Sequence, residues 1–229
     1  MSVIAPSISA TSSILKTQSI RLKTSQQHVR FKLPENVEEV LQKYTISKII
    51  KPYEELILAV RDYEHIQDEQ LLKLLKEVRG CVSYLDRNVH YFVDALLALN
   101  WAYRGDAVVT EFQEFLVDLL SAHNYYTKTV LENLLNRFKS GENEKEWTDG
   151  IPSKKEEVAY NHVHEVLKIL LRVIPMSCDI LVQSISKCFP FHGRPAHEQE
   201  CYIHNILKIT VYQPYLRYQI LFFILKRYV

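Results

Sequence analysis

Residues 106–122 read DAVVTEFQEFLVDLLSA, and this stretch decides the fold class. Its large apolar residues recur at alternating spacings of four and three residues, in the stripe Val108, Phe112, Phe115 and Leu119. Because an α-helix makes one turn in ~3.6 residues, side chains at this spacing lie on one face of a helix. The stretch therefore predicts an amphipathic helix that buries one face against its neighbours.

The same spacing recurs from Pro34 to the end of the chain, and the predicted helices fall into consecutive pairs. The predicted ranges are 35–46 with 52–62, 68–85 with 89–100, 106–122 with 125–139, 155–173 with 177–189, and 197–212 with 214–229. A new pair begins about every 40 residues, which is the period of HEAT and armadillo repeats. We therefore predict an all-α fold, a HEAT/armadillo-like stack of antiparallel helix pairs over residues 34–229. A compact helical bundle is the alternative.

Two sequence signals mark expected helix starts. Asp68 is expected to cap the helix that follows it, and Ser153-Lys-Lys-Glu156 has the form of a capping box. The serine and glutamate of the second motif also fit an acid-directed kinase site. We prefer the capping box, because it explains the same residues by helix geometry alone.

The charge distribution separates a tail from the body of the chain. Residues 1–33 contain no Asp or Glu, are rich in Ser and Thr, and carry the basic residues Lys16, Arg21, Lys23, Arg30 and Lys32. This composition predicts a disordered basic tail. A mitochondrial presequence is a less favoured interpretation, because Pro6 and the Ser/Thr run leave no clean amphipathic helix.

Residues 140–152 contain four acids with Gly and Pro, and predict an exposed acidic loop that is either a connector or a docking element.

The four cysteines lie within apolar helical patterns, which is typical of small core residues in a reducing compartment. The longest strongly apolar run, residues 220–225, is far too short to span a bilayer. We expect no membrane association.

A search of the sequence for catalytic chemistry finds no glycine-rich phosphate loop and no serine nucleophile elbow. His197, Cys201 and His204 are spaced by four and three residues and would share one helix face, as zinc ligands do. No fourth ligand is fixed nearby, so we predict that this face packs against a neighbouring helix. His162 and His164 are two residues apart and point in different directions on a helix. The sequence predicts no catalytic residue, no metal, no cofactor and no enzyme activity.

The C-terminal part of the chain carries a family resemblance. The segment Cys201-Tyr-Ile-His-Asn-Ile-Leu-Lys-Ile-Thr-Val-Tyr-Gln-Pro-Tyr-Leu-Arg-Tyr-Gln-Ile-Leu221 and the preceding Lys187-Cys-Phe-Pro-Phe191 resemble a well-marked stretch of the RNA polymerase I-specific initiation factor family, of the TIF-IA type. Phe115–Ala122 and the helix around residues 85–101 are similar in order and spacing. The resemblance covers most of residues 65–229.

This resemblance implies a HEAT-repeat scaffold that binds RNA polymerase I beside its stalk and bridges it to promoter-bound factors at ribosomal DNA. It implies a location in the nucleus and nucleolus, no direct sequence-specific DNA binding, and regulation by phosphorylation of a surface serine patch that faces the polymerase. We place Ser121 on that partner-binding surface. The alternative interpretation is that Ser121 only ends its helix.

Two departures from the family pattern are visible. Residues 140–152 are less acidic than the strongly acidic, serine-containing insert of the family. Family chains also continue well beyond the point that matches Val229, so we interpret the sequence as a fragment or a short isoform, without the region expected to contact promoter-bound factors. The alternative function is a generic helical-repeat adaptor unrelated to ribosomal transcription.

Overall fold

The protein is described by a computed structural model over residues 33–139, 152–174, 176–191 and 193–228. The predicted basic tail 1–33 and acidic loop 140–152 lie outside these residues, apart from Leu33 and Pro152. Within them every regular element is a helix, and none is long and apolar enough to cross a membrane. The α-helices are α1 (Val37–Ser47), α2 (Lys51–Arg61), α3 (Asp68–Gly80), α4 (His90–Leu97), α5 (Asp106–Ala122), α6 (Thr127–Asn136), α7 (Lys154–Val173), α8 (Ser177–Cys188), α9 (Ala196–Tyr212) and α10 (Arg217–Tyr228).

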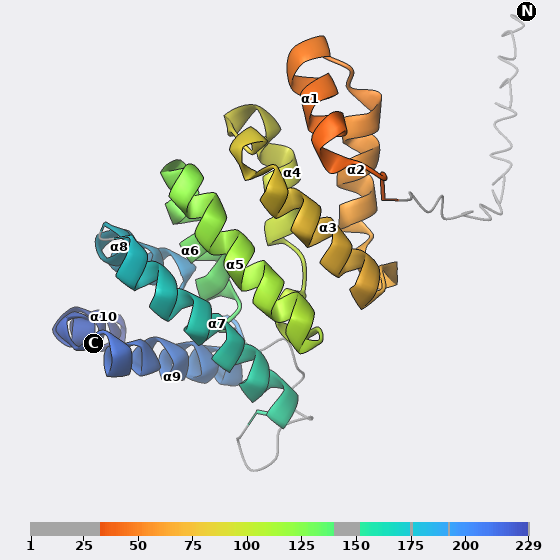
Figure 1. The fold of residues 1–229 in the computed structure, drawn as a ribbon. Coiled ribbons are helices and arrows are strands. Elements are labelled where there is room, and N and C mark those ends of the chain that lie inside the picture. Colours follow the sequence, from red (N-terminus) through yellow and green to blue (C-terminus); the bar gives the residue numbers. More distant parts are fainter. Residues whose placement is uncertain (1–32, 140–151, 175, 192, 229) are drawn as a thin grey trace, which may run out of the picture.

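The helices form a stack in which each odd-numbered helix packs on the next odd-numbered one. α1 packs on α3, α3 on α5, α5 on α7 and α7 on α9. In the other layer α2 packs on α4, α6 on α8 and α8 on α10. Figure 1 shows the array running from α1 and α2 at one end to α9 and α10 at the other. The predicted stack of antiparallel pairs is therefore confirmed, and the compact bundle is excluded.

Several predicted helices are longer than the observed ones. The range 68–85 is interrupted after Gly80, where Cys81 leaves the helical conformation and residues Val82–Tyr84 form a 3-10 turn. Glycine is a poor helix former, which explains the break. The ranges 89–100 and 125–139 shorten to α4 and α6, each with a 3-10 turn beside it.

The core runs through the stack without interruption, and α5 lies at its centre. All of its stripe residues, Val108, Phe112, Phe115 and Leu119, are buried. The Phe112 ring stacks on Trp101 at 5.0 Å between ring centroids and meets Phe115 edge-on at 5.6 Å. Trp101 belongs to the 3-10 turn Trp101–Tyr103, which also packs on α7. The turn before α5 thus joins two successive odd helices, α5 and α7.

The two expected helix starts differ in outcome. The Ser153 hydroxyl accepts a hydrogen bond from the Glu156 backbone N–H at 3.3 Å, so the capping role of Ser153 at α7 is confirmed. The prediction for Asp68 is wrong, because Gln67 occupies the cap position and Asp68 is the first residue of α3. The Asp68 carboxylate instead accepts from the Gly105 backbone N–H, at 3.0 Å, and from Arg104, also at 3.0 Å. A Cβ atom on Gly105 would lie 3.1 Å from that carboxylate, so glycine permits this close approach.

Candidate partner-binding surface

The turns that join each odd helix to the next even helix lie along one edge of the stack, which we call the turn edge. Its turns comprise residues 48–50, 81–89, 123–126, 174 and 176, and 213–216. Neighbouring turns are linked directly. The His123 Nε2 atom lies 2.8 Å from the Val82 carbonyl oxygen, and the Tyr126 hydroxyl donates to the Asp86 carbonyl at 2.9 Å. These links hold successive turns in register.

The opposite edge is joined by charged and polar side chains that are partly or fully buried. Arg137 donates to the Leu97 carbonyl oxygen at 3.0 Å, and the Tyr103 hydroxyl donates to the buried Glu156 carboxylate at 3.0 Å. His162 places Nδ1 2.9 Å from the Ala102 carbonyl oxygen. This edge uses its polar groups for internal contacts.

The turn edge exposes several large apolar side chains, whereas Phe191 is exposed at the opposite edge. A contiguous exposed apolar surface on a folded domain often marks an interaction site. The exposed apolar residues in or beside its turns are Ile46, Ile49, Ile50, Tyr91, Val173, Met176, Val211 and Tyr215. The turn edge is therefore the better candidate for binding a protein partner.

Ser121 lies at this edge, as the second-last residue of α5. Its side chain is exposed, and its hydroxyl donates a hydrogen bond to the Val117 carbonyl oxygen at 2.7 Å. A serine that bonds to the carbonyl four residues earlier is compatible with the helix and adds little stability. Ser121 is thus accessible from solvent.

An acidic stripe precedes Ser121 on the same face of α5. Glu111, Glu114 and Asp118 follow at spacings of three and four residues, and Ser121 continues the series. Arg79 of α3 reaches all three carboxylates: it donates to Glu111 and Asp118 at 2.8 Å each and also contacts Glu114. One positive guanidinium therefore neutralises only part of the charge of three carboxylates. The acidic stripe keeps a net negative charge.

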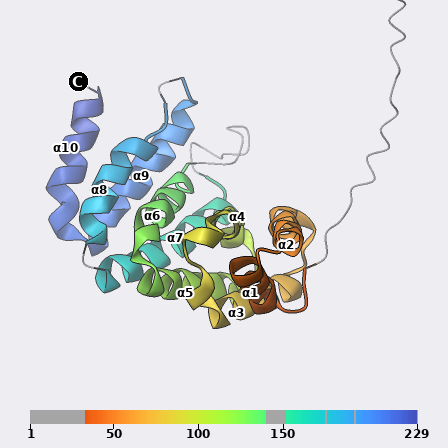
Figure 2. The ribbon, with the colours of Figure 1, turned by 90° about the horizontal axis from the view of Figure 1, so that it is seen from above.

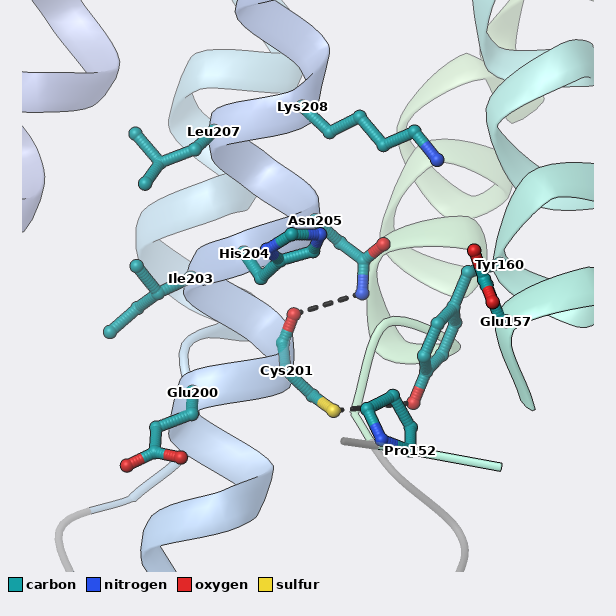
Figure 3. Close-up of a pocket in the computed structure, with 10 residues that line it drawn as sticks. All are labelled: Pro152, Glu157, Tyr160, Glu200, Cys201, Ile203, His204, Asn205, Leu207 and Lys208. Carbon is teal, nitrogen blue, oxygen red and sulfur yellow. Dashed lines mark hydrogen bonds between the residues drawn. The ribbon is translucent and has the colours of Figure 1, made fainter. Parts of the chain in front are cut away.

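A groove of about 650 Å³ lies between α7 and α9 (Figure 3). Cys201 and Asn205 of α9 face Tyr160 of α7, whereas Ile203 and Leu207 project from the other side of α9. The Tyr160 hydroxyl donates to the Cys201 sulfur at 3.6 Å. Burial raises the pKa of the Tyr160 hydroxyl well above its usual value, and its bond to Cys201 adds to the rise. Tyr160 is therefore a neutral structural donor at physiological pH.

The structure separates the residues of the predicted His/Cys cluster. His197 and Cys201 are buried, with Cys201 turned to Tyr160, while His204 is exposed. Among the described residues no three His, Cys, Asp or Glu side chains are grouped so that they could hold a metal ion. The helix face that carries Cys201 packs on α7.

A buried histidine network is the feature that sequence reasoning missed. His164 places Nδ1 3.0 Å from the Tyr212 hydroxyl and Nε2 3.1 Å from the Asn205 side-chain oxygen. Burial lowers the pKa of His164 to about 4, with the Asn205 contact acting in the opposite direction. The buried residues Tyr160, Leu167 and Leu171 lie four residues before and three and seven residues after His164, and this spacing was a signal that His164 shares a buried face. Its two partners come from α9, which no local pattern could reveal.

The continuous stack, the exposed turn edge and the acidic stripe define a helical-repeat protein of the kind that presents extended surface to partners. The family follows from sequence comparison. A family model described as RNA polymerase I specific transcription initiation factor RRN3 matches residues 24–229, and the chain belongs to this family. The resemblance carried by residues 187–221 is thereby confirmed.

Individual relatives agree with this assignment. The RNA polymerase I-specific transcription initiation factor RRN3 of Mus musculus is 28% identical over 173 residues, which cover 71% of this chain and 26% of the mouse protein. The rrn3 factor of Schizosaccharomyces pombe is 28% identical over 148 residues, covering 65% of this chain and 23% of the yeast protein. A putative RRN3-like protein of Homo sapiens, RRN3P2, is 28% identical over 191 residues, covering 83% of this chain and 50% of the human protein. The chain thus spans half or less of the length of these relatives.

A solved structure supports the fold independently. The crystal structure of RNA polymerase I transcription initiation factor Rrn3 superposes on this chain with a TM-score of 0.63 at 18% sequence identity. The match covers 83% of this chain and 37% of the crystallised one. The arrangement of stacked helices is therefore shared with that factor.

Proposed function

We propose that this chain acts in RNA polymerase I transcription initiation as a non-enzymatic scaffold that binds polymerase I. The observation that carries the proposal is the family match over residues 24–229, most of which fold into one uninterrupted stack. A stack of helix pairs offers a long surface and needs no catalytic centre to do its work. Its site of action is then the nucleus, and for ribosomal DNA the nucleolus.

The complete factor, in this proposal, bridges polymerase I beside its stalk to promoter-bound factors at ribosomal DNA. The mouse relative is about four times longer than the part matched here, since the match covers 26% of it. We assign to this chain the polymerase-binding half of the bridge. The contact with promoter-bound factors belongs to a region with no counterpart in these residues.

We place Ser121 on the polymerase-facing surface. It is exposed beside the apolar turn edge, so a protein that covers this edge would meet it. A phosphate on Ser121 would add close to two negative charges at neutral pH. Arg79, the cation nearest to the acidic stripe in the contacts described above, is already engaged by three carboxylates. The phosphate would therefore be poorly neutralised, and its desolvation and repulsion should weaken docking.

The test is a pull-down of the full chain against purified RNA polymerase I. Ser121→Asp should bind at least several-fold more weakly than Ser121→Ala, with unchanged thermal melting of both variants. Ser186→Asp is the matched control, because Ser186 is also exposed near a helix end but lies in α8, toward the opposite edge. Equal binding by both Ser121 variants would remove Ser121 from the contact.

The outcome for the unsubstituted chain decides the wider proposal. Binding to polymerase I supports the initiation-factor function. A well-folded chain that does not bind polymerase I would favour the alternative, a helical-repeat adaptor unrelated to ribosomal transcription.

A further inference from the structure

The segment that leads into α1 forms one wall of a groove of about 550 Å³, which we call the entry groove. The other walls are the connection from α2 to α3 and one side of α3. Figure 2 shows α1, α2 and α3 together at one end of the stack, with α9 and α10 at the other. A cavity of this size lies within the range of about 300–1,000 Å³ that is common for binding sites. The entry groove can therefore hold several side chains of a peptide.

The floor of the entry groove is apolar. Ala59 of α2, Ile66 of the connection and Leu74 of α3 line it, and all three are buried. Leu33, which also lines the groove, is partly buried and packs against the same core. An apolar side chain placed in the groove would extend this core and remove apolar surface from water. The groove therefore favours a peptide that brings at least one large apolar side chain.

The charged side chains around the groove carry an excess of negative charge. Its carboxylates are Glu35, Asp62 and Glu77, and the cation among its lining residues is Lys73. The Lys73 ammonium lies 3.8 Å from the Glu77 carboxylate, but the Lys73 side chain is 71% exposed, so solvent weakens this pair. His65 lies 3.6 Å from Asp62 and is more than half exposed. A peptide with Lys or Arg beside its apolar side chain therefore complements the groove.

The chain itself carries such a peptide directly before Leu33. Residues 29–33 read Val-Arg-Phe-Lys-Leu, in which apolar and basic residues alternate. A residue that precedes proline is held in an extended conformation, and Leu33 precedes Pro34. In an extended chain every second side chain points to the same side. An extended continuation from Leu33 would place Phe31 toward the apolar floor, with Arg30 and Lys32 on the other side, within reach of the carboxylates at the rim.

The covalent connection to Leu33 favours this stretch over a similar peptide on another molecule. Four extended residues span about 13 Å at ~3.3 Å per residue, so residues 29–32 stay close to the groove. A short tether holds a ligand at an effective concentration on the order of millimolar. A second copy of the chain or a partner would have to exceed that concentration, or bind more tightly, to take its place.

We propose that residues 29–32 of this chain dock in the entry groove and cover the core at the α1 end of the stack. Phe31 packs on the apolar floor, and Arg30 and Lys32 pair with the carboxylates of the rim. The disorder predicted for the basic tail then applies to the residues before Val29. This docking does not depend on polymerase I binding, because the entry groove includes the connection from α2 to α3, on the edge opposite the turn edge.

Limited trypsin digestion of the full chain, followed by mass spectrometry, tests the proposal. Trypsin cuts after Lys and Arg, so the tail offers one site within the docked stretch, after Arg30, and one outside it, after Arg21. When a bound segment opens and closes quickly, its cleavage rate follows the fraction that is open. Relative to cleavage after Arg21, cleavage after Arg30 should be about tenfold slower in the chain than in a synthetic peptide of residues 16–35, because the stretch is docked about nine-tenths of the time.

Neutralising the rim should release the stretch. In Glu35→Gln/Asp62→Asn the ratio of the two cleavage rates should return to the value of the peptide, with unchanged thermal melting. Asp94→Asn/Glu165→Gln is the matched control, because it removes two exposed carboxylates from other helices and should keep the ratio of the unsubstituted chain. A ratio in the unsubstituted chain equal to that of the peptide would overturn the proposal. So would protection that survives neutralisation of the rim.

Hydrogen exchange gives a second readout that needs no cleavage site. Phe31→Ser should raise the exchange rates of the amides of residues 29–32 several-fold, because it removes the apolar contact. The protection should not depend on chain concentration, since the stretch and the groove belong to one molecule. Protection that grows with concentration would assign the groove to the tail of a second copy and overturn the intramolecular docking. Polymerase I binding should be the same with and without the rim substitutions, which separates failure here from failure of the proposed function.

Discussion

Helices α5 and α10 have the same kind of apolar spacing but differ in how much of the apolar face is buried. α5 lies between α3 and α7, and its stripe is buried throughout. α10 contacts α9 and α8, and its residues Tyr218, Leu221, Phe222 and Leu225 stay exposed. The difference shows that an apolar stripe is buried only where the described stack supplies a neighbour on that side.

The largest effect is expected in the middle of the stack. Phe112→Ala should lower the free energy of unfolding by about 3–5 kcal/mol, because it removes a fully buried ring that packs on Trp101 and Phe115. Chemical denaturation followed by circular dichroism would measure this loss. A loss below about 1 kcal/mol would mean that the centre of the stack is no better packed than its end.

The junction between α7 and α9 should respond to acid. The folded-state pKa of His164 is about 4, below the ordinary value of about 6.5, so the unfolded chain binds the proton more readily. Its contribution to stability is present above about pH 6.5 and is lost as pH falls through about 4; between pH 7 and 4.5 the loss is about 2.5 kcal/mol.

His164→Gln is the control for this titration, because it keeps polar atoms near Asn205 and Tyr212 but has no proton to gain. The difference in unfolding free energy between the two proteins should shift with pH over this range, in favour of the variant at low pH. A difference that does not change between pH 7 and 4.5 would contradict a neutral buried His164.

A smaller effect is expected where α3 and α5 meet at the surface. Arg79→Ala should cost about 1–2 kcal/mol, because it leaves three carboxylates together, although solvent screens part of their repulsion. Raising the salt concentration from low to ~1 M should reduce this cost, since added ions screen the repulsion. Arg79→Lys should recover part of the lost stability. A cost that is independent of salt would point to packing of the arginine stem instead.

The smallest effect on stability is expected on the exposed apolar face of α10, which is formed by Tyr218, Leu221, Phe222 and Leu225. Phe222→Ala should change the free energy of unfolding by no more than about 0.5 kcal/mol, because its ring is more than half exposed. The measurement is the same denaturation used for Phe112→Ala, which makes the two phenylalanines a matched pair. A loss of 2 kcal/mol or more would show that a neighbour covers this face in solution.

Much of the fold could be predicted because its signals are local. The spacing of Val108, Phe112, Phe115 and Leu119 identifies a helix and its buried face. The four-residue motif that begins at Ser153 marks the start of another helix. The roughly 40-residue recurrence of helix pairs then predicts the stack, since each pair must cover the apolar face of the previous one. The family resemblance at residues 187–221 likewise rests on residues that are contiguous in the chain.

The remaining features depend on residues that are distant in sequence, and only the tertiary structure decides them. Asp68 has the chemistry of a helix cap, yet it holds Gly105, 37 residues further on, because stacking brings the two turns together. His164 is neutral because burial between α7 and α9 lowers its pKa. The stripe of α10 has the same periodicity as that of α5, and its exposure is set by the absence of a covering helix among the described residues. Periodicity is a property of one helix, whereas burial, pKa and accessibility depend on what packs against it.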